Sequence, residues 1–167
     1  QPSPEIQSLA AKGAVINPAK GAAGHPSVVI LAVKPQMAAD VMPSVANLVS
    51  AETLVLSVMA GKTLAFLQAV LPGAAIVRAM PNTPAAIGRG ITVLVPNAKV
   101  TPAQRSTATD LLSATGIVEW IGDEALMDAV TAVSGSGPAY VFLLAETLAQ
   151  AGIAAGLPKE LAERLAR

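Results

Sequence analysis

The chain has 167 residues, which is enough for one domain, or slightly more, to bury a core. Because 53% of the residues are hydrophobic but only 2% are aromatic, Ala, Val, Leu and Ile must build that core. Eleven basic residues balance eleven acidic ones without a basic run, which excludes the clustered charge of a nucleic-acid-binding surface and favours a small ligand, of which an anion is one candidate. The absence of cysteine excludes disulfides and thiolate chemistry, the single histidine argues against a zinc site, and the apolar stretches are too short for a membrane span.

The first half of the chain alternates between helical and strand patterns. Residues 3–13 favour a short helix, and residues 14–16 favour a short edge strand. Val28 to Val33 is an unbroken apolar run between two prolines, which is typical of a central strand buried on both faces. Helical patterns follow at residues 36–49 and 63–71, and strand patterns at residues 53–58 and 75–80. This alternation predicts an α/β fold in which parallel strands end at one edge of a sheet.

The second half of the chain begins with strand patterns and ends with helical ones. Residues 91–95 and 116–121 favour strands, and residues 102–114 favour a helix that Thr101 caps and Pro102 opens. We expect these elements to extend the same sheet. Three more helices are predicted, at residues 123–133, at residues 138–152 and from about residue 158 to the last residue.

Small and polar residues follow the ends of three predicted strands, in the segments 32–35, 58–61 and 80–84. Ligands of open α/β sheets bind outside the carboxyl ends of the strands. A crevice lined by main-chain groups, a few apolar side chains and Lys34 would suit a flat, partly charged cofactor such as a dinucleotide. The same segments equally fit ordinary strand-to-helix turns, in which Asn82 and Thr83 would bond to their own backbone.

Further polar residues give signals of unequal weight, and the segment Ser134 to Pro138 is the more informative one. Ser134 to Pro138 would expose N–H groups at the start of a helix, which suits a bound anion and a closely packed hinge equally well. Arg78 and Arg89 are candidate anion clamps, with a surface role favoured for Arg89, and His25 is interpreted as a loop residue. Three carboxylates lie in the first turns of one predicted helix: Asp123, Glu124 and Asp128. Their favourable interaction with the helix dipole explains their position, so no catalytic role is assigned to them.

Three segments, VILAVKPQ, RAMPNTPAAIGRGIT and GIVEWIGDEALMDAVTAVSGSGPAYVFLLAE, follow one another in an order that resembles bacterial pyrroline-5-carboxylate reductases. The similarity runs from about Val28 to Arg167, and its PNTP and DAVTAVSGSGPAY segments are specific to that family. It implies a partial Rossmann-like, doubly wound α/β domain at residues 1–122, followed at residues 123–167 by the start of an all-helical dimerisation domain. It also implies reduction of 1-pyrroline-5-carboxylate to L-proline by hydride transfer from NADPH or NADH, in a cytoplasmic homo-oligomer.

The resemblance assigns expected roles to the candidate residues. The cofactor's ribose and pyrophosphate would lie against Ala32, Val33, Lys34 and Pro35, and Asn17 would contact the adenosine ribose. The nicotinamide side would be bordered by Val58, Met59, Ala60, Met80, Asn82 and Thr83. The substrate and the nicotinamide would meet the helical domain at Ser134, Gly135, Ser136, Gly137 and Pro138. Because hydride transfer to a protonated C=N bond needs orientation and water exclusion more than a protein acid or base, no residue is assigned as catalytic and no metal site is expected.

Two features of the family are absent from this sequence. Family members open with a strand and a Gly-rich turn, and carry a Ser-Pro-Gly-Gly-Thr-Thr-like loop that holds the substrate carboxylate. We therefore expect this chain to be a fragment that is inactive or very weak by itself, with an exposed apolar face made of Tyr140, Val141, Leu143, Leu144 and Leu148. The alternatives are a related NADP-dependent imine or β-hydroxyacid reductase, and a non-catalytic fragment that binds cofactor or dimerises.

Overall fold

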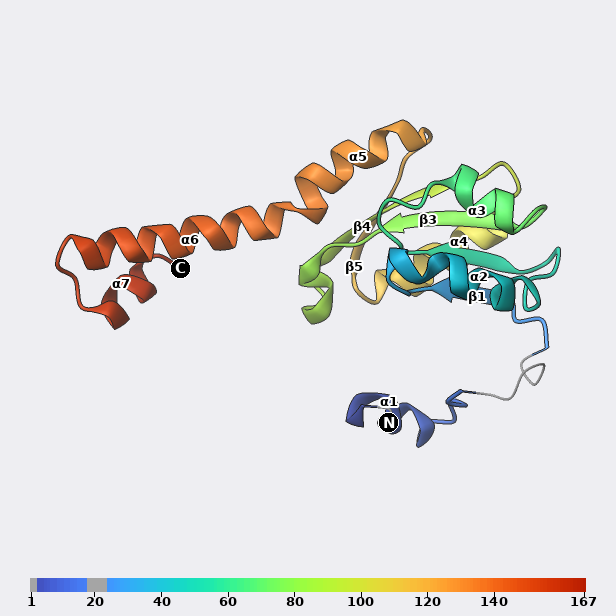
Figure 1. The fold of residues 1–167 in the computed structure, drawn as a ribbon, viewed down its shortest axis with the longest axis horizontal. Helices are drawn as coiled ribbons and strands as arrows, with labels where there is room; N and C mark the ends of the chain where they lie inside the picture. The colour runs from blue at the N-terminus through green and yellow to red at the C-terminus, as the bar shows by residue number, and fades with distance from the viewer. Residues whose placement is uncertain (1–2, 18–23) are drawn as a thin grey trace.

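A five-stranded sheet forms the body of the computed structural model, which describes residues 3–17 and 24–167 (Figure 1). The strands lie side by side in chain order: β1 (Val28–Leu31), β2 (Leu54–Ser57), β3 (Ala75–Met80), β4 (Gly90–Pro96) and β5 (Gly116–Trp120). All neighbouring pairs are parallel except β3 and β4, which are antiparallel. The predicted α/β fold is confirmed, and the second half of the chain extends the same sheet as expected.

Helices cover both faces of the sheet. On one face lie α2 (Ala38–Ala46), which follows the short 3₁₀-helix η1 (Pro35–Met37), and α3 (Leu64–Val70). The other face is covered by α4 (Pro102–Ser113). Two threonine hydroxyls cap helices, because Thr63 Oγ1 accepts the Phe66 N–H at 3.1 Å and Thr101 Oγ1 accepts the Gln104 N–H at 3.2 Å.

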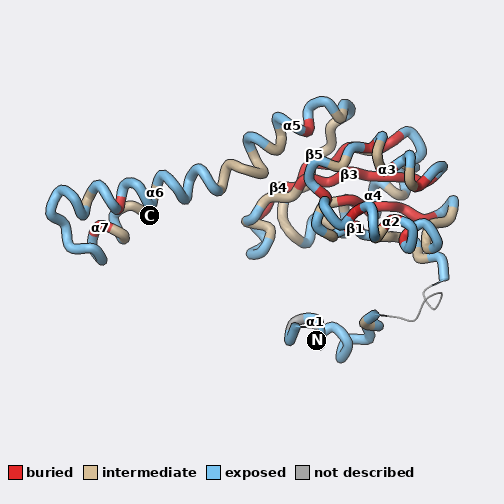
Figure 2. Tube along the Cα trace, viewed as in Figure 1, coloured by how far each residue is buried: buried red, intermediate tan, exposed pale blue. Residues whose placement is uncertain are grey.

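Burial is concentrated in the middle of the sheet, where all six residues of β3 are buried (Figure 2). The strand β1 departs from our prediction of a central strand buried on both faces: within the described residues it lies at the edge of the sheet and pairs only with β2. Its Ile30 is 53% exposed on the face that α4 covers, because α4 lies over the strands on the far side of the sheet and mainly contacts β5.

The N-terminal segment contains the predicted helix but not the predicted strand. The helix α1 (Pro4–Ala10) is capped by Ser3, whose Oγ accepts the Ile6 N–H at 3.4 Å. Residues 14–16 form no strand, since Val15 is 77% exposed and this segment lies apart from the sheet, so no neighbouring backbone can pair with it (Figure 1). The small residues at positions 17–26 favour a loop or a frayed helix, and part of this segment, residues 18–23, lies outside the described residues.

The last part of the chain is a helical arm, by which we mean residues 124–167. It consists of η3 (Glu124–Leu126), α5 (Met127–Val130), the π-helical segment η4 (Thr131–Gly135), α6 (Gly137–Ala154) and α7 (Lys159–Leu165). The helix predicted at residues 123–133 is therefore present, but it is divided into three types of helix and extends to Gly135. The Ser136 N–H bonds to the Thr131 carbonyl, five residues back, at 2.8 Å, which widens the helix at this point.

The helix α6 points away from the sheet, and α7 folds back against α6 (Figure 1). The five apolar residues that we expected to be exposed are between 52% and 63% exposed: Tyr140, Val141, Leu143, Leu144 and Leu148. Among residues 3–17 and 24–167, no helix combines the length and the apolar character needed to cross a membrane. The arm thus presents a long apolar surface, of which the described chain covers only the part that packs against α7.

Candidate functional site

The carboxyl ends of β1, β2 and β3 lie together at one edge of the sheet, because the three strands are parallel neighbours. Small residues leave the main chain open there: Ala32 and Ala60 are exposed, and Gly61 has a φ of 70°, a conformation that favours glycine. Val33, Pro35 and Val58 are half-buried beside them. The three predicted strand ends are thus brought to one place.

Lys34 stands at this edge as the residue that precedes η1. Its carbonyl oxygen accepts the Met37 N–H at 2.9 Å, and its side chain is exposed. Within the described part of the chain, its ammonium group makes no ion pair or side-chain hydrogen bond. The charge is therefore available to an anionic group that approaches the edge of the sheet.

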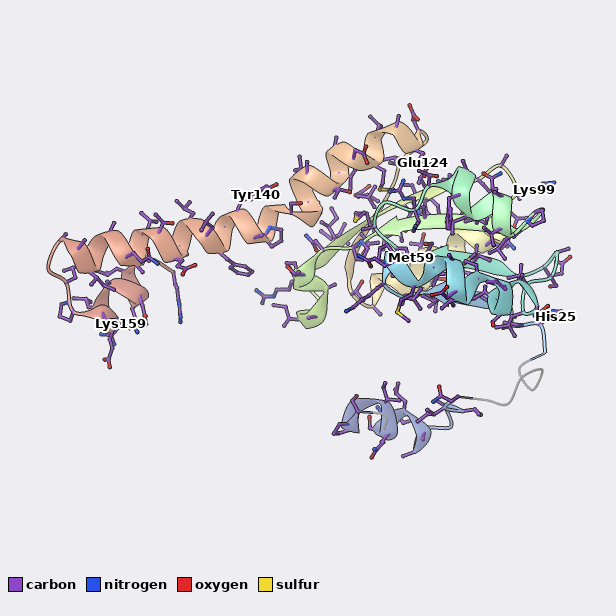
Figure 3. The ribbon with its side chains drawn as sticks, viewed as in Figure 1. His25, Met59, Lys99, Glu124, Tyr140 and Lys159 are labelled. Atoms are coloured by element: carbon purple, nitrogen blue, oxygen red, sulfur yellow. The ribbon has the colours of Figure 1, made fainter. Side chains whose placement is uncertain are left out.

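Met59 lies at the same edge but faces inward (Figure 3). It is only 1% exposed, and its side chain belongs to the core cluster that also contains Met80 and Met127. Its N–H donates to the buried Ser57 Oγ at 3.4 Å. Of the candidates that follow β2, Val58 and Ala60 can therefore offer side chains to a ligand, whereas Met59 can only support them.

Asn82, directly after β3, joins two segments that are far apart in sequence. Its Oδ1 accepts the Ile91 N–H at 2.9 Å, which fixes the return from β3 into β4. Its Nδ2 donates to Ser134 Oγ at 3.4 Å, which ties the turn to the helical arm. Thr83 is exposed at the start of the 3₁₀-helix η2 (Thr83–Ile87) that follows.

The π-helical segment of the arm lies against the end of β3. A Cβ atom on Gly135 would lie 3.8 Å from Met80 Sδ, so the arm approaches the strand at ordinary contact distance. π-helical turns are rare and often occur at functional sites. Ser136 and Gly137 continue from this contact into α6 and are partly exposed. Of the predicted candidates, the structure brings together four at this junction: Met80, Asn82, Ser134 and Gly135.

Asn17 is not brought to this junction. It is exposed, with a φ of 49°, and belongs to the segment of α1 that lies apart from the sheet (Figure 1). His25 is likewise exposed, in the loop before β1. Arg89 is exposed next to Gly88, in agreement with the surface role that we favoured.

Sequence reasoning missed the partnership between Arg78 and Glu124. The Arg78 Nη1 lies 2.7 Å from Glu124 Oε1, and the same oxygen accepts the Leu64 N–H at 2.8 Å. The helix dipole is thus an incomplete account of Glu124, although it suffices for Asp123, which caps η3 by accepting the Ala125 N–H at 2.9 Å. One signal was available: an arginine inside an otherwise apolar buried strand requires a buried partner.

The junction contains hydrogen-bonding and apolar groups but few titratable ones. Among the described residues, no group of three or more His, Cys, Asp or Glu side chains could hold a metal ion. A separate cavity of about 550 Å³ lies between α6 and α7, far from the strand ends, and is lined in part by Phe142, Ile153, Lys159 and Arg167. The junction can therefore orient a ligand and exclude water, but its side chains are poorly suited to acid–base chemistry.

Two family descriptions match parts of the chain. Residues 124–167 match the pyrroline-5-carboxylate reductase dimerisation family, and residues 2–61 match the family described as NADP oxidoreductase coenzyme F420-dependent. The first match covers the helical arm, and the second covers the chain as far as the turn after β2.

Curated relatives and solved structures are similar over most of this chain. The pyrroline-5-carboxylate reductase of Synechocystis sp. is 48% identical over 145 residues, which cover 87% of this chain and 54% of the relative. That of Pseudomonas aeruginosa is 49% identical over 139 residues, which cover 83% of this chain and 51% of the relative. The structure of the Coxiella burnetii enzyme superposes with a TM-score of 0.78 at 39% identity, covering 88% of this chain and 55% of that one.

A pyrroline carboxylate reductase of Plasmodium falciparum, solved with NADP bound, superposes with a TM-score of 0.80 at 33% identity, covering 88% of this chain and 56% of that one. The chain thus spans about half the length of the relatives that it matches. Sequence and fold agree over that half, from the sheet to the helical arm. The chain therefore belongs to the pyrroline-5-carboxylate reductase family.

Proposed function

We propose that the protein reduces 1-pyrroline-5-carboxylate to L-proline by hydride transfer from NADPH or NADH. The observation that carries the proposal is the junction at which the turn after β3 contacts the arm, through Asn82 and Ser134. Both segments, PNTP and SGSGPAY, are those in which this chain resembles the reductases. The proposal is further supported by the relatives' names and by the NADP in the Plasmodium falciparum structure.

The sheet and the arm divide this function between them in the proposal. Residues 1–122 form the cofactor-binding domain, and residues 123–167 begin the helical dimerisation domain. Two observations support this division: the core clusters consist almost entirely of residues before 122, and the dimerisation family matches residues 124–167.

The carboxyl edge of the sheet fits a nicotinamide dinucleotide. Exposed main chain at Ala32 and Ala60 allows close approach of a flat group, and the unpaired Lys34 can bind an anionic phosphate. The cofactor, when bound there, supplies the hydride. Other residues assigned to its binding are Val33, Pro35, Val58, Met80 and Asn82, with Met59 contributing through its main chain and packing. Asn17 is left out of this assignment because its segment lies apart from the sheet.

In this reaction the protein's own residues act by holding the reactants in place. Ser134, Gly135, Ser136 and Gly137 close the substrate side of the junction, and Asn82 and Thr83 close the opposite side. Gly135 lies close to Met80, since a Cβ atom on this glycine would be 3.8 Å from Met80 Sδ, and this leaves little room for water at the end of β3. Holding the imine carbon at reacting distance can account for a large part of the rate, and few titratable groups are then required.

We also propose that the protein is a cytoplasmic homo-oligomer that associates through the arm. The apolar side chains along α6 are exposed in a single chain, and a stable chain would bury such a surface against a partner. The dimerisation family that matches the arm supports a second copy as that partner.

The direct test is an assay of the full-length protein for oxidation of NADPH in the presence of 1-pyrroline-5-carboxylate. We expect oxidation that depends on both compounds and yields one proline for each NADPH consumed. If NADPH is oxidised with a β-keto acid, which reduction converts to a β-hydroxyacid, but not with the imine, the related reductase is favoured instead. Binding of NADPH without turnover of either substrate would contradict the proposed activity.

A further inference from the structure

Arg78 is a buried charge in the middle of an apolar strand. It is 4% exposed, and it lies on β3, whose six residues are all buried. Its Nη1 lies 2.7 Å from a charged partner, Glu124 Oε1, while its buried Nε has no hydrogen-bond partner among the residues that the structure describes. An arginine that leaves one donor unsatisfied is a poor choice for stability alone, so its position calls for another reason.

Glu124 connects three elements through a single oxygen. Its Oε1 accepts from Arg78 Nη1 on β3 and from the Leu64 N–H, the first N–H group of α3, at 2.8 Å. Glu124 is also the first residue of η3 and hence of the helical arm (Figure 3). The ion pair therefore fixes the point at which the arm leaves the sheet.

A series of contacts along the arm connects Glu124 to the proposed site. Met127 is fully buried in the core cluster with Met80, and Thr131 Oγ1 donates to the Met127 carbonyl at 2.8 Å. The Ser136 N–H donates to the Thr131 carbonyl, so that the segment between Glu124 and Ser136 is continuously hydrogen-bonded.

The arm then contacts the same strand again, at positions that share one face. Arg78 and Met80 are two residues apart on β3, so their side chains lie on the same face of the sheet. Asn82 lies two residues beyond Met80, in the turn that follows the strand. Glu124 pairs with Arg78, Ser134 accepts a hydrogen bond from Asn82, and Gly135 lies beside Met80, whose Sδ would be 3.8 Å from a Cβ atom on that glycine. The first of these contacts is the only charged one among the three, and it is the deepest in the sheet.

We infer that Arg78 and Glu124 are a positioning pair that sets where Ser134 and Gly135 lie over Met80 and Asn82. Neither side chain touches the substrate in this inference, which rests on the proposed function. The pair acts on the distance between the arm and the strand end, and therefore more on turnover than on cofactor affinity. Lys34 follows β1, two strands away from Arg78, although Ser57 of β2 is the direct neighbour of Arg78 in the sheet.

The test replaces Glu124 in the full-length protein and follows two readouts, hydrogen exchange and kcat, with the Kd for NADPH as a third measurement. In Glu124→Ala we expect the Ser136 amide to exchange its hydrogen faster, because the arm loses its fixed point, and kcat to fall by about tenfold or more, because small misplacements of a reacting group are costly. The Kd for NADPH should change less than kcat, since Lys34 and the exposed main chain at Ala32 follow β1, two strands away from the pair.

Two further variants keep the test decisive. Asp128→Ala removes an exposed carboxylate one helical turn further along the arm and should leave both readouts unchanged. Glu124→Gln keeps an oxygen that can accept from Arg78 and Leu64, so it should fall between wild type and Glu124→Ala in both readouts. If Glu124→Ala does not fold, the comparison of wild type with Glu124→Gln decides.

Three outcomes would overturn the inference. Unchanged exchange and unchanged kcat in the Glu124 variants would show that the pair does not set the position of the arm. A lower kcat without faster exchange at Ser136 would show that Glu124 acts by another route, and an equal loss of NADPH affinity would show a merely structural role. If the wild-type protein does not reduce the imine, the proposed function fails, and the exchange readout still decides whether the pair positions the arm.

Discussion

Leucines in the two regions of the molecule lie in opposite environments. Leu56, in the middle of the sheet, is completely buried, whereas Leu144, in the middle of α6, is 60% exposed. The sheet region thus has its own core, with helices on both faces, while the arm has an apolar surface that only α7 covers in part. The difference indicates that the sheet region is stabilised within one chain and that the arm depends on what binds to it.

The largest expected effect tests the first half of that statement. Leu56→Ala should lower the free energy of unfolding by about 2–5 kcal/mol, because it removes buried methyl groups and leaves a cavity in the sheet. The matched substitution Leu144→Ala should cost less than about 0.5 kcal/mol when the protein is diluted to a single chain, since that leucine is largely exposed. Urea unfolding of both variants at low protein concentration measures the two values, and equal costs would contradict the comparison.

The next effect tests the dependence of the arm on a partner. Leu144→Asp should raise the dissociation constant of the oligomer by about thirtyfold or more, equivalent to about 2 kcal/mol, because it places a charge within an apolar contact. Leu111→Asp is a matched control, since Leu111 is an exposed leucine on α4 of the sheet region, 44% exposed. Sedimentation equilibrium distinguishes the two, and a wild-type protein that stays monomeric at all concentrations would refute the proposed association.

A third effect concerns the contact between the two regions. Asn82→Ala leaves the Ile91 N–H without its acceptor and breaks the bond to Ser134, which should lower the free energy of unfolding by about 1–3 kcal/mol and also reduce kcat. Asn97→Ala is the matched control, because the buried Asn97 bonds to Ile76, Ala74 and Lys99 within the sheet region alone.

We expect the Asn97 variant to lose comparable stability while the enzyme that remains folded keeps its kcat. Steady-state kinetics corrected for the folded fraction provide the measurement. Loss of kcat in both variants to the same degree would mean that Asn82 matters only for folding, and would remove it from the proposed site.

The sheet region was largely predictable from sequence because its signals are local. Short, mainly apolar runs mark β2 and β3, although Ser57 and Arg78 interrupt them, and capping threonines mark the starts of α3 and α4. The two wrong predictions in this region also have physical causes. A short apolar segment at residues 14–16 has no strand beside it to pair with, and β1 lies at the edge of the sheet, although its composition is that of a buried strand.

The junction was predictable in its parts but not in its contacts. The turn after β3 and the segment Ser134 to Pro138 each carried a signal, yet nothing local indicates that Asn82 and Ser134, 52 residues apart, would share a hydrogen bond. The role of Glu124 was missed for the same reason, since its partners Arg78 and Leu64 lie 46 and 60 residues away. Long-range polar contacts depend on the packed fold, which a single sequence read locally does not provide.

The smallest expected effect concerns cofactor binding by the sheet region alone. Lys34→Ala should weaken NADPH binding by roughly fivefold, about 1 kcal/mol, because the exposed ammonium group at the end of β1 can contact a phosphate but remains screened by water. Lys99→Ala removes an exposed lysine from the loop after β4, away from the carboxyl ends of β1 to β3, and should leave the affinity unchanged. Fluorescence titration with NADPH measures both dissociation constants, and the loss in Lys34→Ala should shrink at high salt because the contact is electrostatic. Since the arm takes no part in this contact, Leu144→Asp should bind NADPH as wild type does; a shared loss of affinity would mean that the cofactor site extends into the arm and that the two regions are not separable.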